Sequence, residues 1–192
     1  MGKKLSLQAM IEVSIFTALA MLLDFLPSIK PIPSISISLA MVPIFIIAFR
    51  WGFLASFVAG FLWGILQIVL GVAWILTPTQ AFIEYFIAFA FIGFAGLFAG
   101  LVKRNLQQNL KTRASLWIVI GVFVGGAARY FWHFIAGVIF FKNYAIEAGK
   151  SPFIFSFLTN GTSFFFASIG CAIVLILLIA KAPRLITSAS GE

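Results

Sequence analysis

Charged residues are scarce in this 192-residue chain, making up 9% of it, whereas hydrophobic residues make up 62%. This balance excludes an ordinary soluble globular protein. At about 20 apolar residues for each membrane crossing, the chain has room for roughly six transmembrane helices and for no separate soluble domain. We therefore predict an all-α integral membrane protein in which residues 1–192 form one six-helix bundle and a single domain.

Cysteine and histidine each occur once. Cys171 has no partner for a disulfide within the chain and lies in an apolar run, so we expect it to act as a small hydrophobic residue. His133 lacks the HExxH or CxxC spacings that are typical of metal sites, so no metal is expected. No imidazole stands near Cys171 in the sequence to activate it for nucleophilic catalysis. We predict neither a cofactor nor enzymatic activity.

A phosphate-binding loop is also lacking. Residues 144–151, YAIEAGKS, end like a Walker A motif, but Tyr144 occupies the place of its first glycine. This excludes ATP hydrolysis by that route, so uphill transport would need energy from a partner protein or an ion. The net charge of +8 does not indicate nucleic-acid binding, because the basic residues lie at the ends of apolar segments, where they set membrane topology.

Six apolar segments are present, at residues 7–26, 37–49, 53–70, 79–102, 114–141 and 152–180. Glu12 interrupts the first and no small-residue cleavage site follows, so we expect a retained helix rather than a signal peptide. Prolines then begin a loop at residues 27–36, which we interpret as a lid. The second segment is short and contains Pro43, which leaves open whether it crosses the membrane fully.

Basic residues are distributed unequally between the two sides of the predicted bundle. Three belong to one side, namely Lys30, Lys142 and Lys150, and nine belong to the other, namely Lys3, Lys4, Arg50, Lys103, Arg104, Lys111, Arg113, Lys181 and Arg184. By the positive-inside rule the richer side is cytoplasmic. We therefore predict a multi-pass protein of the cell membrane with both termini in the cytoplasm.

Glu84 is a single carboxylate inside the apolar run GVAWILTPTQAFIEYFIAFAFIGFAG at residues 71–96. A charge near the bilayer centre costs roughly 2.5 to 3.5 kcal/mol on insertion scales, so such acids face a protein interior and meet a partner. Gln80 precedes Glu84 by one helical turn and can share its pocket. Trp74 and Tyr85 also stand nearby, so we predict a functional site here.

Two further polar clusters occur at a compatible depth. Arg129 and His133 are one helical turn apart, and Asn160 follows Thr159 near the outer end of the last segment. Aromatic residues accompany these clusters, namely Trp74, Tyr85, Trp132, Phe141, Tyr144 and Phe155. The pattern predicts an outward-facing polar pocket with aromatic walls, suited to a small, flat, heteroaromatic cation. Two structural alternatives stay open: Glu84 could pair with Arg129 only to hold the bundle, and His133 could be an ordinary helix contact.

Small residues spaced four apart recur at Gly60 and Gly64, Gly96 and Gly100, and Gly121 and Gly125. We interpret these pairs as sites of close helix packing. Ser14 and Ala18, with Thr17 beside them, form a comparable stripe on the first segment. The pattern alone favours packing inside the bundle over docking of a partner subunit.

The runs GVAWILTPTQAFIEYFIAF and YFWHFIAGVIFF, followed by an Asn-Gly pair in the last segment, resemble a known family. They are similar to the thiamine-specific substrate-binding (S) components of energy-coupling factor (ECF) transporters, the ThiT family. The resemblance covers essentially the whole chain. It implies a prokaryotic membrane subunit that binds thiamine without chemistry and relies on a coupling transmembrane subunit and two ATPase subunits.

The resemblance also implies roles for individual residues. Arg129 falls where a basic residue is usual, and Ser14 with Ala18 matches a small-xxx-small motif that resembles the one used to dock on the coupling subunit. Phe141 stands where a tryptophan is expected and Phe155 where a tyrosine is frequent, which keeps stacking but removes a hydroxyl; the first outer loop holds no tryptophan. Ligand contacts are implied for Glu84, Tyr85, His133, Asn160, Trp74, Phe141 and Arg129.

Three other functions are distinguishable. The first is an S component for another small heteroaromatic vitamin or precursor. The second is an intramembrane enzyme, for which Glu84 and His133 are the only candidate acid and base, and which product formation from a bound ligand would reveal. The third is a cation channel, which would need rings of acids along its pore, whereas this sequence places one acid at one depth.

Overall fold

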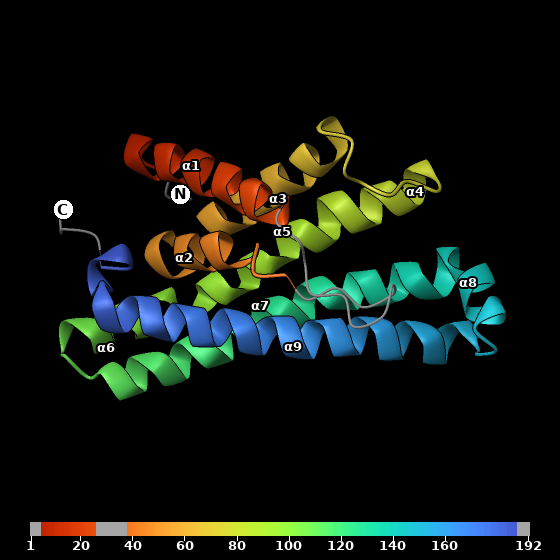
Figure 1. Ribbon diagram of the computed structural model, residues 1–192. Coiled ribbons are helices and arrows are strands. Elements are labelled where there is room, and N and C mark those ends of the chain that lie inside the picture. Colours follow the sequence, from red (N-terminus) through yellow and green to blue (C-terminus); the bar gives the residue numbers. More distant parts are fainter. Residues whose placement is uncertain (1–4, 26–37, 188–192) are drawn as a thin grey trace.

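Helices make up nearly all of the described part of the chain, which covers residues 5–25 and 38–187 of the computed structural model (Figure 1). Two apolar helices are shorter than a membrane span, α2 (Val42–Trp51) and α3 (Phe53–Val69). Four helical stretches are long and apolar enough to span, namely α1 (Leu7–Asp24), the composite helix Pro78–Gln107, α7 (Lys111–Phe140) and α9 (Pro152–Lys181). These six match the predicted segments, and the all-helical membrane fold is confirmed.

The short helix α2 forms the centre of the bundle. Every residue from Val42 to Phe49 is buried, and the helix contacts α1, α3, α6 and α9. A helix that is apolar on all sides is expected in such a position. Pro43 lies in its first turn, where a missing N–H costs nothing, so it starts this helix rather than kinking it. Gly52 then takes a left-handed conformation (φ 86°) that separates α2 from α3.

The composite helix Pro78–Gln107 departs from α-helical winding in two places. It begins as α4 (Pro78–Ala81), where Thr77 accepts the N–H of Gln80 at 3.1 Å. A π-helical turn, η1 (Phe82–Ala88), follows and carries Glu84 and Tyr85. After α5 (Phe89–Phe91) comes a 3₁₀ stretch, η2 (Ile92–Phe98), and then α6 (Ala99–Gln107). π-Turns inside helices often mark functional sites, and apolar periodicity did not reveal this one.

Glycines on α3 let its backbone touch the π-helical turn. A Cβ atom added to Gly64 would lie 1.6 Å from the carbonyl oxygen of Tyr85, and one added to Gly60 would lie 2.2 Å from that of Phe89. The packing interpretation therefore holds for this pair, and it places Tyr85 against α3. Gly100 is an exception, because a Cβ there would meet nothing within 4 Å.

The contact between α3 and η1 predicts that adding a methyl group lowers stability at Gly64 but not at Gly100. We expect Gly64→Ala to destabilise the protein by about 1 to 3 kcal/mol, because α3 must move away from η1. Gly100→Ala is the matched control and should leave stability unchanged or slightly raised, since alanine favours helix. Thermal unfolding in detergent measures both variants. Equal melting temperatures would contradict the close approach of these two backbones.

Arg50 joins three elements at one end of the bundle. Its guanidinium donates to Glu12 of α1, with an Nη2 to Oε1 distance of 2.7 Å, and to the carbonyl of Arg184 at 3.0 Å. The indole of Trp51 also donates to Glu12, at 2.7 Å. The charge that interrupts the first apolar segment is thus paired at this end. Helices α4 and α8 (Lys142–Glu147) lie at the opposite end (Figure 1).

The stripe of small residues on α1 divides between two faces. Thr17 is buried and donates its hydroxyl to the carbonyl of Ala59 at 3.3 Å, whereas Ser14 and Ala18 are exposed. The preference for internal packing is therefore wrong for Ser14 and Ala18 and correct for Thr17. The reason is that neighbouring helical positions differ by about 100° around the axis. The predicted lid at residues 27–36 lies outside the described residues.

Candidate functional site

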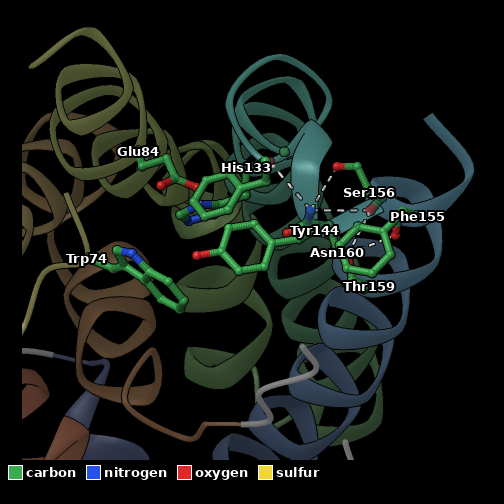
Figure 2. Close-up of a pocket in the computed structure, with 10 residues that line it drawn as sticks. Trp74, Glu84, His133, Tyr144, Phe155, Ser156, Thr159 and Asn160 are labelled. Carbon is green, nitrogen blue, oxygen red and sulfur yellow. Dashed lines mark hydrogen bonds and ion pairs between the residues drawn. The ribbon is translucent and has the colours of Figure 1, made fainter. Parts of the chain in front are cut away.

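A cavity of about 360 Å³ opens at the α4 and α8 end of the bundle (Figure 2). Its volume lies within the range of small-molecule sites. The lining side chains come from the loop before α4 and from η1, α7, α8 and α9. They are Trp74, Glu84, His133, Gly137, Phe141, Tyr144, Phe155, Ser156, Thr159 and Asn160. The three polar clusters that lie far apart in the sequence are therefore brought together.

The Glu84 carboxylate is held by two neighbours. Oε2 accepts a hydrogen bond from the amide of Gln80, and Oε1 lies 3.3 Å from Nδ1 of His133. Only 13% of the Glu84 side chain is exposed. The π-helical turn and its contact with α3 fix the backbone from which this carboxylate projects. Glu84 is thus an oriented acceptor at the cavity wall.

His133 is oriented from behind by Arg129. The Arg129 Nε lies 3.4 Å from His133 Nε2 and donates to it. Because a guanidinium has donors only, Nε2 must be the acceptor, and the ring proton is then on Nδ1, which donates to Glu84. The imidazole in this arrangement is neutral. It orders Glu84 without cancelling its charge.

Arg129 does not form the ion pair with Glu84 that the sequence left open. Its guanidinium carbon lies 4.1 Å from the centroid of the Phe89 ring and 4.6 Å from that of the Trp63 ring. It also does not line the cavity, because it sits one helical turn before His133, away from the cavity mouth. The alternative in which Glu84 pairs with Arg129 only to hold the bundle together is therefore wrong.

Tyr85 and Gln80 hold the loop that carries Trp74. The Tyr85 hydroxyl accepts the backbone N–H of Trp74 at 2.7 Å, and the Gln80 amide donates to the Trp74 carbonyl at 3.0 Å. Gln80 is fully buried and also accepts the N–H of Leu76 at 3.0 Å. Tyr85 is thus placed behind the cavity wall and not on it.

The hydrogen bond between the Tyr85 hydroxyl and the Trp74 backbone predicts that removing this hydroxyl has a moderate effect on ligand affinity. Tyr85→Phe should weaken ligand binding about threefold to tenfold, because the loop loses an anchor worth roughly 1 kcal/mol. Tyr130→Phe, which alters a tyrosine outside the cavity lining, is the control. Titration of intrinsic tryptophan fluorescence measures both affinities. A loss of several orders of magnitude would instead indicate direct contact between the Tyr85 hydroxyl and the ligand.

Aromatic rings form one wall of the cavity. The Trp74 ring meets the Phe141 ring edge-on at 6.2 Å between centroids and the Tyr144 ring at 5.7 Å. Trp74 is 58% exposed and lines the cavity, so part of its surface is open to a ligand. Trp132, which the sequence also suggested as a wall, packs on Phe91 at 5.4 Å and does not line the cavity.

The far wall is made by α7 and α9. Asn160 donates through Nδ2 to the Ser156 hydroxyl at 3.1 Å and to the His133 carbonyl at 3.4 Å, as the dashed lines in Figure 2 indicate. Its Oδ1 has no donor among the described residues and is available to a ligand. A Cβ on Gly137 would lie 2.2 Å from the Ser156 hydroxyl. Gly137 and Ser156 were not singled out by the sequence, although Gly137 stands in the HFIAG run.

Comparison with known proteins addresses the identity of this site. The family model described as thiamine transporter protein (Thia_YuaJ) matches residues 10–187. The chain belongs to this family. It is 37% identical to the thiamine transporter ThiT of Bacillus subtilis (strain 168) over 190 residues, which is 98% of each chain.

Two further relatives extend this family match. The chain is 33% identical to the thiamine transporter ThiT of Lacticaseibacillus paracasei over 189 residues, covering 97% of this chain and 94% of the relative. A solved structure of ThiT from Listeria monocytogenes superposes with a TM-score of 0.90 at 42% identity, covering 94% of this chain and 97% of that one. The family is one of transporters, so the intramembrane enzyme is excluded, and the multi-pass membrane location is confirmed.

Proposed function

We propose that this chain binds thiamine in the cavity described above and serves as the substrate-binding component of an ECF vitamin transporter. The observation that carries the proposal is the position of the Glu84 carboxylate and the neutrality of the groups that bind it. Its carboxylate faces an aromatic-walled cavity and is held by two neutral donors, Gln80 and His133. One negative charge is therefore available to a cationic ligand such as thiamine.

The residues that line the cavity suggest how thiamine would lie in it. The cationic thiazolium ring faces Glu84 and stacks near Trp74, where charge attraction and cation–π contact act together. The aminopyrimidine ring extends toward α9, where Oδ1 of Asn160 accepts from its amino group. His133 and Phe141 complete the walls, while Tyr85 and Arg129 support the site from behind.

The partners of the chain are part of the same proposal. The exposed positions Ser14 and Ala18 let another helix approach α1 closely, so we assign them to docking on the coupling subunit. Two ATPase subunits supply the energy. The unequal distribution of basic residues supports a cytoplasmic location of both termini. The cavity lies at the end of the bundle opposite the contacts of Arg50 with Glu12 and Arg184, so in this orientation it faces outward. The whole chain acts as one domain.

Mass spectrometry of the ligand that accompanies the purified protein tests this function. We expect thiamine to be released on denaturation in about equimolar amount, given that tight pocket binders survive purification. Protein stripped of ligand should then rebind thiamine in preference to other heteroaromatic vitamins. A different vitamin in the cavity, with no binding of thiamine, would favour the alternative S component.

A further inference from the structure

Asp24 is a second carboxylate inside the bundle, and it lies outside the cavity lining. At the last residue of α1, it accepts from the Trp63 indole N–H at 2.9 Å and from the Gln67 amide, both on α3. The Ser38 hydroxyl donates to it at 3.4 Å. All three donors are neutral. Asp24 is also the only aspartate in the sequence.

Arg129 is the complementary cation, and among the described residues it forms no direct ion pair with a carboxylate. Its guanidinium lies over the face of the same Trp63 ring, 4.6 Å from the centroid. Trp63 thus carries Arg129 on its face and Asp24 at its N–H edge. Opposite charges held at the edge and on the face of one ring attract each other.

The charges around Trp63 and His133 do not cancel. Among the described residues, three charged side chains meet there inside the bundle: Asp24, Glu84 and Arg129. Two are negative and one is positive, because His133 is neutral. If Arg129 were balanced by Glu84, the uncancelled negative charge would be that of Asp24, which lies outside the cavity lining, and none would face a ligand. Trp63 instead contacts both Arg129 and Asp24 and so holds these two charges near each other. The His133 ring lies between Arg129 and Glu84.

We propose that Asp24 determines the charge specificity of the cavity by neutralising Arg129, which leaves Glu84 free for a cation. Asp24 touches no ligand and acts through Arg129, so it is a positioning residue. The inference uses thiamine as the ligand and in that respect rests on the proposed function. It predicts an effect on the preference for a positive charge and not on binding in general.

The test compares two ligands of the same shape. Thiamine carries a cationic thiazolium ring, and its thiophene analogue is neutral. Calorimetry on wild type and Asp24→Asn gives the ratio of their affinities. We expect this ratio to fall about tenfold in Asp24→Asn, the size of effect that an uncompensated unit charge has over roughly 10 Å at an effective dielectric constant of about 20. Asparagine retains an acceptor for the Trp63 N–H.

Two further variants separate charge from folding. Arg129→Gln can still donate to His133 and should raise the ratio, and the double variant Asp24→Asn/Arg129→Gln should return it to the wild-type value. Glu12→Gln removes the other acid of α1, paired with Arg50 at the opposite end, and should leave the ratio unchanged.

Equal weakening of both ligands in Asp24→Asn would overturn the proposal and reduce Asp24 to a structural role. If Asp24→Asn does not fold, Arg129→Gln alone tests the proposal. An unchanged ratio of the affinities for thiamine and its thiophene analogue in Arg129→Gln would also contradict the inference. Failure of wild-type protein to bind thiamine would instead overturn the proposed function, so the two failures are distinguishable.

Discussion

Replacing Glu84 by glutamine should weaken thiamine binding by about 2 to 5 kcal/mol, the range for truncating one member of a buried charge pair. The substitution keeps the shape of the side chain and its bond with Gln80, but deletes the charge that faces the ligand. Calorimetric titration of purified protein measures the loss. We expect the neutral thiophene analogue to lose much less affinity, because its ring carries no positive charge.

Glu147→Gln is the matched control for charge removal. Glu147 is exposed at the end of α8, the helix that supplies Tyr144, but it does not line the cavity. Its replacement should leave affinity unchanged. If Glu84→Gln binds thiamine as tightly as wild type, Glu84 is not the counter-charge. If the variant instead melts at a much lower temperature, Glu84 serves mainly to hold His133 and Gln80.

Ala18→Leu should abolish thiamine uptake by cells while leaving thiamine affinity of the isolated protein unchanged. Ala18 is exposed on α1, on a different side from the cavity lining, so a larger side chain there blocks a partner helix and not the ligand. Uptake of labelled thiamine and calorimetry together give the two readouts.

Ala127→Leu is the matched control for this variant. Ala127 is an exposed alanine on α7, and the same enlargement there should preserve uptake, since exposed substitutions usually change stability by less than about 0.5 kcal/mol. Loss of thiamine binding in purified Ala18→Leu would mean that this face of α1 supports the cavity. Normal uptake in Ala18→Leu would remove Ala18 from the docking surface.

The sequence predicted the six helices because long apolar runs have few alternatives in a membrane. It also predicted that the Glu84, His133 and Asn160 clusters converge, since isolated polar groups at one depth must share a protein interior. The glycine pair on α3 was interpreted correctly as packing. Its exact partners, the backbones of η1 and α5, could not be predicted, because the π-helical turn has no periodic signature.

The role of Arg129 could not be inferred from spacing. Its opposite charge and similar depth in the membrane made Glu84 the obvious partner. In the structure its guanidinium instead packs over the rings of Trp63 and Phe89. Asp24 escaped notice because it stands at the end of an apolar run, where acids are common. Only the fold reveals that α3 brings Trp63 between Asp24 and Arg129.

An experimental structure of the protein bound to thiamine tests the central claim most directly. The proposal predicts the thiazolium ring beside the Glu84 carboxylate, within the wall formed by Trp74 and Phe141, and the aminopyrimidine at Asn160. Thiamine bound with its cationic ring away from Glu84, or outside this cavity altogether, would contradict the account.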